Sequence, residues 1–184
     1  MGTFEGMNAG ARRLWGTESL HGRHVTVLCV VQVGYYLVQH LAQEGAKITV
    51  TDIDADKIKR AVDEFGVEVC SLDAIYDVPC DIYAPCALGG TINDDTIDRI
   101  HCKLIAGSAN NVLQDEDVHG RRLRELGILY CPDYVINAGG LINVANELEG
   151  YNQQRALRQA AQIHATIDRI FAYADEKNIP TILA

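Results

Sequence analysis

Residues 25–52 read VTVLCVVQVGYYLVQHLAQEGAKITVTD and decide the fold of the chain. The apolar run Val25–Val30 predicts a strand, and the apolar residues that follow at three- and four-residue spacing predict an amphipathic helix. Gly45 can end this helix in a left-handed conformation, and Ile48–Thr51 predicts the next strand. Because the second strand ends at the acidic Asp52, the whole stretch has the pattern of the first half of a dinucleotide-binding unit.

The turn of this unit departs from the glycine pattern G-x-G-x-x-G, because its three glycine places hold Cys29, Val31 and Gly34. The first glycine permits a sharp turn, the second lets a pyrophosphate reach the backbone, and the third lets the helix pack on the strand. Only the packing glycine is present. We expect the branched Val31 side chain to stand where the helix N–H groups would meet phosphate, so that dinucleotide binding is weak or lost.

Composition predicts an ordinary folded domain. The 184 residues are 48% apolar, which is enough for a full core. The 16 basic and 25 acidic residues give a net charge of −9, which argues against a nucleic-acid surface, and we interpret the arginines at 121, 122 and 124 as a solvated helix face. No apolar run reaches the length of a membrane span, and the N-terminus lacks the apolar centre of a signal peptide, so we expect a cytoplasmic location.

The six cysteines and six histidines do not suggest a metal site. The cysteines show no C-x-x-C spacing, and most of them lie in or beside expected strands, as small apolar residues would. The histidines are scattered along the chain without a ligand spacing. We therefore expect reduced, structural cysteines and no bound metal.

The rest of the chain alternates strands and helices. Further strands are expected at Val67–Cys70, Ile82–Ala84, Leu104–Ala106 and Ile128–Cys131, and helices at Phe4–Leu14, Ala55–Phe65, Asp94–Ile100, Glu116–Leu126, Leu141–Leu148 and Gln153–Lys177. Asp54 and Asn93 are the expected N-caps of two of these helices, and Gly66 is an expected helix end. Residues 132–140 are expected to form a loop.

This alternation predicts an α/β three-layer Rossmann fold, with a doubly wound, mainly parallel sheet and helices on both faces. The expected strand order is 3-2-1-4-5-6. We expect a single Rossmann-type domain over residues 1–184, divided into an entry helix and linker (1–22), a core (23–150) and a C-terminal helix (151–184).

Three expected strand-end loops are similar to those of a known family. They read DIYAPCALGG (Asp81–Gly90), IAGSANN (Ile105–Asn111) and PDYVINAGGLINVANE (Pro132–Glu147). In wording and order they resemble the cofactor domain of the leucine, phenylalanine and valine dehydrogenases, within the glutamate dehydrogenase superfamily. The resemblance extends from about Gly6 to Thr181. It implies an NAD-dependent enzyme that oxidatively deaminates an L-amino acid to a 2-oxo acid.

The resemblance also implies a set of cofactor contacts. Asp52 would bind the adenosine ribose and favour NAD over NADP, because a carboxylate repels a 2′-phosphate. The N–H groups of Gln32 and Val33 would bind the pyrophosphate, and the loops after the later strands would hold the nicotinamide and the edge of the substrate. The predicted cofactor-binding residues are Gln32, Val33, Gly34, Asp52, Ile53, Cys86, Ala87, Ala109, Asn110 and Asn137.

The same residues have simpler interpretations. Asp52 can cap the next turn, and Asn110, Asn111 and Asn137 can be turn residues. These alternatives stay open from the sequence.

No catalytic residue is predicted in this chain. The family takes its catalytic lysines, which move protons, from an N-terminal substrate domain, and we expect that domain to be missing here. The five lysines of this chain fall on expected helices or strand edges instead: Lys47, Lys57, Lys59, Lys103 and Lys177.

Three functions therefore remain open. The chain can be a truncated dehydrogenase domain that still binds NAD weakly, or a scaffold, partner-binding or engineered domain that no longer binds it. It can also be an enzyme with new chemistry in the old cleft, using Asp52, Cys86 or Asn137. The expected partners are a dinucleotide or small-molecule ligand, together with a second copy of the chain or a separate substrate-domain chain. We expect no nucleic-acid partner and no membrane.

Overall fold

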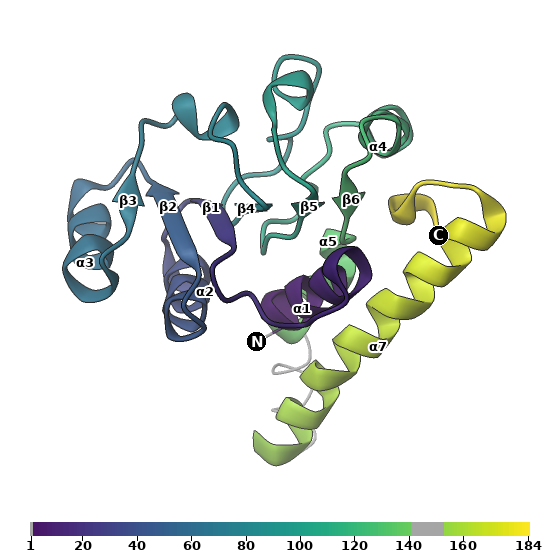
Figure 1. The fold of residues 1–184 in the computed structure, drawn as a ribbon, viewed down its shortest axis with the longest axis horizontal. Helices are drawn as coiled ribbons and strands as arrows, with labels where there is room; N and C mark the ends of the chain where they lie inside the picture. The colour runs from purple at the N-terminus through teal and green to yellow at the C-terminus, as the bar shows by residue number, and fades with distance from the viewer. Residues whose placement is uncertain (1, 141–152) are drawn as a thin grey trace.

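The computed structural model describes residues 2–140 and 153–184. Its centre is a six-stranded sheet in the order β3-β2-β1-β4-β5-β6, with every neighbouring pair parallel (Figure 1). The strands are β1 (His24–Leu28), β2 (Lys47–Thr51), β3 (Glu68–Val69), β4 (Ile82–Pro85), β5 (Leu104–Ile105) and β6 (Leu129–Tyr130). The predicted strand order is confirmed.

The helices cover both faces of this sheet, as predicted. They are α1 (Gly2–Trp15), α2 (Gln32–Gln43), α3 (Ala55–Phe65), α4 (Glu116–Glu125), α5 (Asp133–Ile136) and α7 (Gln153–Lys177), with 3₁₀ turns η1 (Ala74–Tyr76), η2 (Ile97–Arg99) and η3 (Thr181–Leu183). One apolar layer joins the sheet to α1, α2 and α7, and includes Met7, Leu41 and Ile167. The other joins it to the 3₁₀ turns and α4, and includes Ile75 and Leu123.

Local capping chemistry fixes the ends of α2 and α3. The Asp54 side chain accepts hydrogen bonds from the backbone N–H groups of Asp56 and Lys57, at 3.0 and 3.3 Å, which satisfies two free donors at the start of α3. Gly66 ends α3 at φ 66°, and Gly45 follows α2 at φ 78°. The predicted cap at Asp54, the left-handed Gly45 and the helix end at Gly66 are confirmed.

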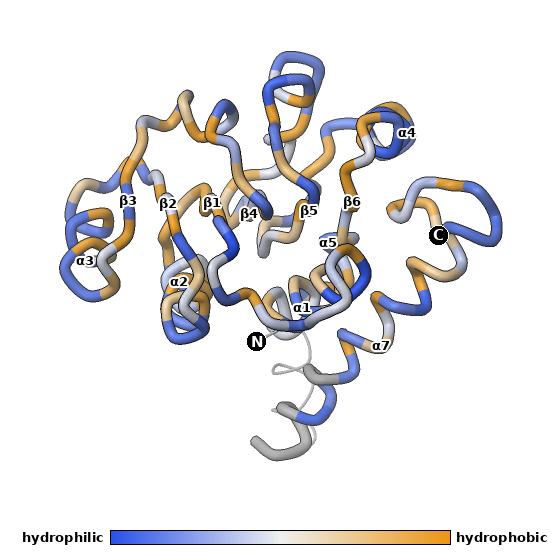
Figure 2. Tube along the Cα trace, in the orientation of Figure 1, coloured by the Kyte–Doolittle hydropathy of each residue, from blue (hydrophilic) through white to orange (hydrophobic). Residues whose placement is uncertain are grey.

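Helix α7 has the predicted bounds. Its apolar residues Ile163, Ile167 and Phe171 are buried in the layer shared with α1, and Figure 2 shows apolar and polar segments alternating along it. Within the described ranges, no helix has the length and apolar composition needed to cross a membrane. The expected helix Leu141–Leu148 lies outside the described residues.

The predicted helix Asp94–Ile100 is wrong, because only the short turn η2 forms there. The Asn93 side chain accepts from the N–H groups of Asp95 and Thr96, and the Thr96 hydroxyl donates to a carbonyl five residues back. The Asn93 bonds are those of the expected N-cap, whereas the Thr96 bond ties the first turn back to residue 91. Ile100 then returns to an extended conformation, which ends the turn.

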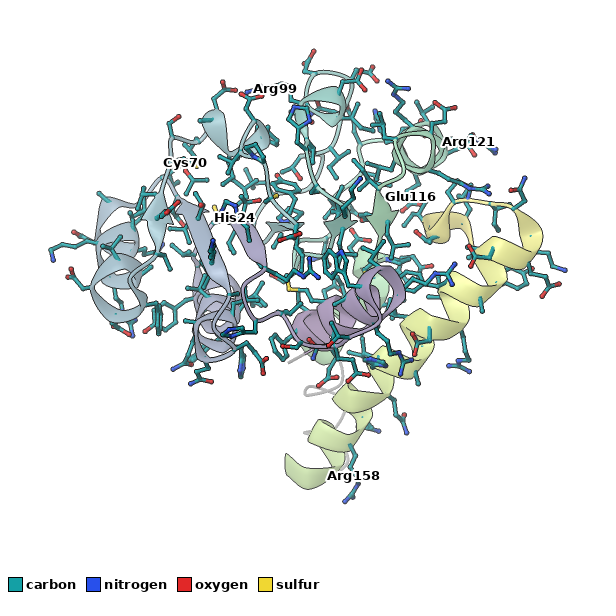
Figure 3. All side chains as sticks on the ribbon, viewed as in Figure 1. His24, Cys70, Arg99, Glu116, Arg121 and Arg158 are labelled. Carbon is teal, nitrogen blue, oxygen red and sulfur yellow. The ribbon has the colours of Figure 1, made fainter. Side chains whose placement is uncertain are left out.

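Turn η2 is tied to η1 by Arg99, which lies on the side of the sheet away from α1 (Figure 3). Its guanidinium binds the carboxylates of Asp73 and Asp77, at 3.0 and 2.8 Å, and faces the Tyr76 ring at 5.5 Å. Planar, two-sided pairing of this kind suits arginine. Arg99 thereby joins the two 3₁₀ turns η1 and η2.

Two other predictions need correction. Strand β1 ends at Leu28 and not at Val30, because the next residue, Cys29, adopts a positive φ that a strand cannot contain. Residues 132–140, expected as a loop, contain the short helix α5, whose first residue is the buried Asp133.

Candidate functional site

The turn between β1 and α2 lies at the carboxyl end of the sheet. Cys29 occupies the first glycine place of the pattern and has φ 74°. A non-glycine residue in this region costs about 1–2 kcal/mol. Its N–H donates to the Thr51 carbonyl at 2.9 Å, which attaches the turn to β2. The turn therefore keeps a conformation suited to glycine although glycine is absent.

Gly34 holds α2 close to this turn. A Cβ placed on Gly34 would lie 2.1 Å from the carbonyl oxygen of Cys29, far inside van der Waals contact, and 3.3 Å from the Cβ of Cys86. Only glycine allows the helix to approach the strand end so closely. Its position matches the packing place of the glycine pattern.

Asp52 follows β2 and is 6% exposed. One carboxylate oxygen accepts from the Val30 N–H at 2.8 Å, and the other accepts from the Asp54 N–H at 3.0 Å. The side chain therefore holds the first turn and the start of α3 together. Since a carboxylate oxygen can accept more than one hydrogen bond, contact with a ribose stays a prediction.

The charge of this carboxylate also acts on the thiol of Cys29. Burial and the negative charge of Asp52 raise the pKa of Cys29 to about 11. At neutral pH the thiol is therefore protonated. Asp52 thus acts on two residues of the turn, through a hydrogen bond to Val30 and through its charge on Cys29.

A cavity of about 360 Å³ lies in front of α2. Its walls are formed by Val30, Val31, Gln32, Tyr35, Tyr36, Lys57 and Arg60. Val31 is the N-cap residue of α2 in an extended conformation, and no side chain of the described residues caps this helix. Lys57 pairs with Asp54 at 3.1 Å, and Arg60 stacks over the Tyr35 ring at 4.1 Å.

These features fit the phosphate-bearing part of a dinucleotide. An uncapped helix N-terminus carries free N–H groups and a partial positive charge, and two cationic side chains share the cavity. Gln32 and Val33, both exposed, form the first turn of α2, and Ile53, at 83% exposed, follows Asp52. Val31 is 44% exposed and forms part of the cavity wall.

The other predicted residues follow β4, β5 and β6. Cys86 follows β4, and its N–H donates to the Leu28 carbonyl at 2.9 Å, while Ala87 is half-buried beside it. Burial raises the pKa of Cys86. A thiol that stays protonated is a poor nucleophile. Ala109 is buried, and its N–H donates to the Pro85 carbonyl at 3.0 Å.

Asn110 and Asn137 meet although 27 residues separate them, because the Asn137 side-chain amide donates to the Asn110 side-chain oxygen. The structure thus gathers the predicted residues into two groups. Those after β1 and β2 form the group beside the cavity. Those after β4, β5 and β6 form a second group, which includes this asparagine pair. Among the described residues, no cluster of three or more histidine, cysteine or acidic side chains could hold a metal ion.

Sequence reasoning missed Asp133. This residue is 5% exposed, and its carboxylate accepts from the N–H groups of Val112 and Tyr134, both at 2.9 Å. An acid two residues after an expected strand was the available signal, since Asp52 similarly follows β2.

The family model and the similar sequences named below all point to one family of amino-acid dehydrogenases. The family model for glutamate/leucine/phenylalanine/valine dehydrogenase matches residues 50–179. Leucine dehydrogenase of Thermoactinomyces intermedius is 53% identical over the whole of this chain and 50% of its own length. Phenylalanine dehydrogenase of the same organism is 45% identical over 98% of this chain and 50% of its own length. The chain therefore spans about half the length of these relatives.

Solved structures agree with the sequence relatives. The crystal structure of L-tryptophan dehydrogenase from Nostoc punctiforme has a TM-score of 0.96 and 42% identity, covering 98% of this chain and 54% of that one. A glutamate dehydrogenase structure from Thermus thermophilus, at 16% identity and a TM-score of 0.72, shares the fold over 98% of this chain and 49% of that one. The resemblance inferred from the strand-end loops is confirmed: the chain belongs to the glutamate/leucine/phenylalanine/valine dehydrogenase family.

Proposed function

We propose that this chain is the NAD-binding half of an L-amino-acid dehydrogenase, with an affinity for NAD lowered by Cys29 and Val31. The observation that carries the proposal is the arrangement at the carboxyl end of β1 and β2. Gly34 holds the uncapped start of α2 against the strand, and Asp52 stands beside it. In open α/β sheets this is where a dinucleotide binds.

Each group of residues has a separate role in this proposal. The first N–H groups of α2 neutralise the pyrophosphate, and Asp52 accepts hydrogen bonds from the ribose hydroxyls. Asn110 and Asn137 orient the nicotinamide and the edge of the amino acid. Bound NAD would supply the hydride acceptor for oxidation of a substrate such as leucine, valine or phenylalanine.

The proton-transfer groups come from elsewhere in this proposal. Lys47 begins β2 and Lys103 directly precedes β5, both at the edge of the sheet opposite the cavity, and Lys177 ends α7. Lys57 and Lys59 lie on α3. None of them stands on the loops after β4, β5 and β6. We propose that a separate substrate domain, or a second copy of the chain, completes the active site.

Ligand binding tests the proposal directly. A ligand that binds only the folded state raises the melting temperature, so NAD and AMP should each raise the melting temperature of the chain. NADH fluorescence titration gives the affinity. If neither NAD nor AMP raises the melting temperature at millimolar concentration, the proposal is wrong.

One observation favours the scaffold as a second candidate. The Cys29 N–H donates to the Thr51 carbonyl, the Val30 N–H donates to Asp52, and Val31 lines the cavity, so the turn is already stabilised without a ligand. Repurposed chemistry at Cys86 has less support, because burial raises the pKa of that thiol.

We also propose a cytoplasmic location. All six cysteines lie in the described residues and none forms a disulfide, which fits a reducing compartment.

A further inference from the structure

The buried carboxylate of Asp133 joins two loops of the second group. One oxygen accepts from the Val112 N–H at 2.9 Å, 21 residues away in the chain, and the other accepts from the Tyr134 N–H at 2.9 Å. With 5% exposure, this side chain has little access to water that could replace either bond. The loop after β5 is therefore attached to the first turn of α5 through a single side chain.

The same two segments carry the asparagine pair. Asn110 lies two residues before Val112, and Asn137 follows α5 directly. The hydrogen bond between their side chains requires that the loop and the helix keep a fixed separation. The carboxylate of Asp133 bridges the same two segments.

Backbone bonds fix the other side of the loop. The Gly90 N–H donates to the Asn111 carbonyl at 2.7 Å, and the Ile92 N–H donates to the Val112 carbonyl at 3.1 Å. Val112 is thus held through its carbonyl by the loop after β4 and through its N–H by Asp133. Removal of the carboxylate would free only the side that faces α5.

We infer that Asp133 is a positioning residue, whose carboxylate holds Asn110 and Asn137 at the spacing that receives the nicotinamide end of the ligand. The identity of that ligand rests on the proposed function, whereas the positioning of the two asparagines does not. A positioning residue holds the side chains that contact the ligand in the correct place. Small displacements of those side chains weaken ligand binding.

The variant Asp133→Asn tests this role with little change in volume. An amide has one oxygen, so one of the two backbone donors would face an NH₂ group and lose its acceptor. The matched control is Asp81→Asn, because Asp81 also accepts a backbone N–H, that of His24 at 2.8 Å. His24 starts β1, whereas the asparagine pair lies on segments that follow the carboxyl ends of β5 and β6, at the opposite end of the strands.

Two measurements separate the outcomes. The first is the side-chain amide signal of Asn137 in NMR spectra of the full chain without ligand. It should move towards the position of a solvent-exposed amide in Asp133→Asn and stay in place in Asp81→Asn. The second is the ratio of affinities for NADH and ADP-ribose, which lacks the nicotinamide. This ratio should fall by about tenfold in Asp133→Asn only.

An unmoved Asn137 signal in Asp133→Asn would overturn the inference whatever the ligand is. A moved signal, with no binding of NADH or ADP-ribose to the unmutated chain, would support the positioning role and contradict the proposed function. A moved signal with an unchanged affinity ratio would overturn the role in nicotinamide binding. If Asp133→Asn does not fold, Asp133→Glu keeps the charge on a longer side chain, and the same shift of the Asn137 signal is expected.

Discussion

The backbone N–H of Val30 donates to the carboxylate of Asp52 across 2.8 Å, although 22 residues separate them. The acid after β2 thereby holds the turn after β1. Cys29 keeps its positive φ because its own N–H donates to the Thr51 carbonyl and the N–H of its neighbour Val30 donates to Asp52. The residue predicted to contact the ribose is also part of the frame of the turn.

Replacement of Asp52 by Ala should change both specificity and stability. The unmutated chain should prefer NAD to NADP, because a carboxylate repels a 2′-phosphate, and the variant should narrow that difference. Loss of a buried acceptor for the Val30 N–H should also lower the free energy of unfolding by about 1–3 kcal/mol. Isothermal titration with both dinucleotides and urea unfolding measure the two effects. Equal affinities for NAD and NADP in the unmutated chain would mean that Asp52 serves the turn alone.

Cys29→Gly should stabilise the chain. Glycine adopts φ 74° without the penalty of about 1–2 kcal/mol that a side chain incurs, while its more flexible unfolded state costs about 0.5–1 kcal/mol. A net gain of up to about 1 kcal/mol follows from these two terms. Val31→Gly is the control, since Val31 has φ −68° and gains nothing from glycine. Chemical unfolding of both variants should give shifts of opposite sign.

Val31→Gly should restore dinucleotide affinity more than Cys29→Gly. The Val31 side chain lines the cavity at the start of α2, where phosphate must approach the backbone. If the obstruction costs about 3 kcal/mol, the variant should bind NADH roughly a hundredfold more tightly. NADH fluorescence titration of the two variants and the parent decides the order. The same affinity in the parent and in Val31→Gly would show that the valine does not obstruct the phosphate.

Cys29 should react slowly with alkylating reagents unless the pH approaches its raised pKa of about 11. Its pKa is raised from 9.0 to about 11, so folding favours the protonated thiol, and this stabilisation is present below pH 9 and lost as the pH rises through about 11. Asp52→Asn removes one cause of the rise and should speed the iodoacetamide labelling of Cys29 several-fold at pH 8.5. Peptide mapping by mass spectrometry gives the rate for each cysteine, and Cys102, whose pKa burial raises, serves as the internal reference. An unchanged labelling rate at Cys29 would show that the charge of Asp52 does not raise the pKa of this thiol.

The chain alone should not reduce NAD in the presence of leucine, valine or phenylalanine. Its five lysines lie on α3, at the end of α7 or at the opposite edge of the sheet, so the proposed active site has no lysine from this chain to move a proton. Absorbance at 340 nm follows the reaction. Turnover above background would show that another group of this chain moves the proton.

Much of the fold follows from local signals in the sequence. The strand order and the caps at Asp54 and Gly66 were predictable, because apolar spacing and capping chemistry act over a few residues. The failed helix Asp94–Ile100 shows the limit of these signals: the cap at Asn93 forms, but the Thr96 hydroxyl bonds back to the Thr91 carbonyl and the chain becomes extended at Ile100.

The candidate site was less predictable, because its key bonds are distant in the chain. The sequence places Asp52 at a strand end, but the fold alone reveals that it binds the Val30 N–H. Asp133 escaped notice for the same reason, since its partner Val112 lies on another loop. The motif resemblance identified Asn110 and Asn137, and their direct contact emerged only from the packing of the segments after β5 and β6.

The close contact between Gly34 and the Cys29 carbonyl has an evolutionary consequence. A side chain at residue 34 would push α2 away from the sheet, so residue 34 does not tolerate substitution. Substitutions at residues 29 and 31 alter only the turn between β1 and α2. The packing of α2 on the sheet through Gly34 stays the same. If Cys29 and Val31 lower the affinity for NAD, as we propose, then two single-residue exchanges in the turn would restore it without any change in the sheet or in α2.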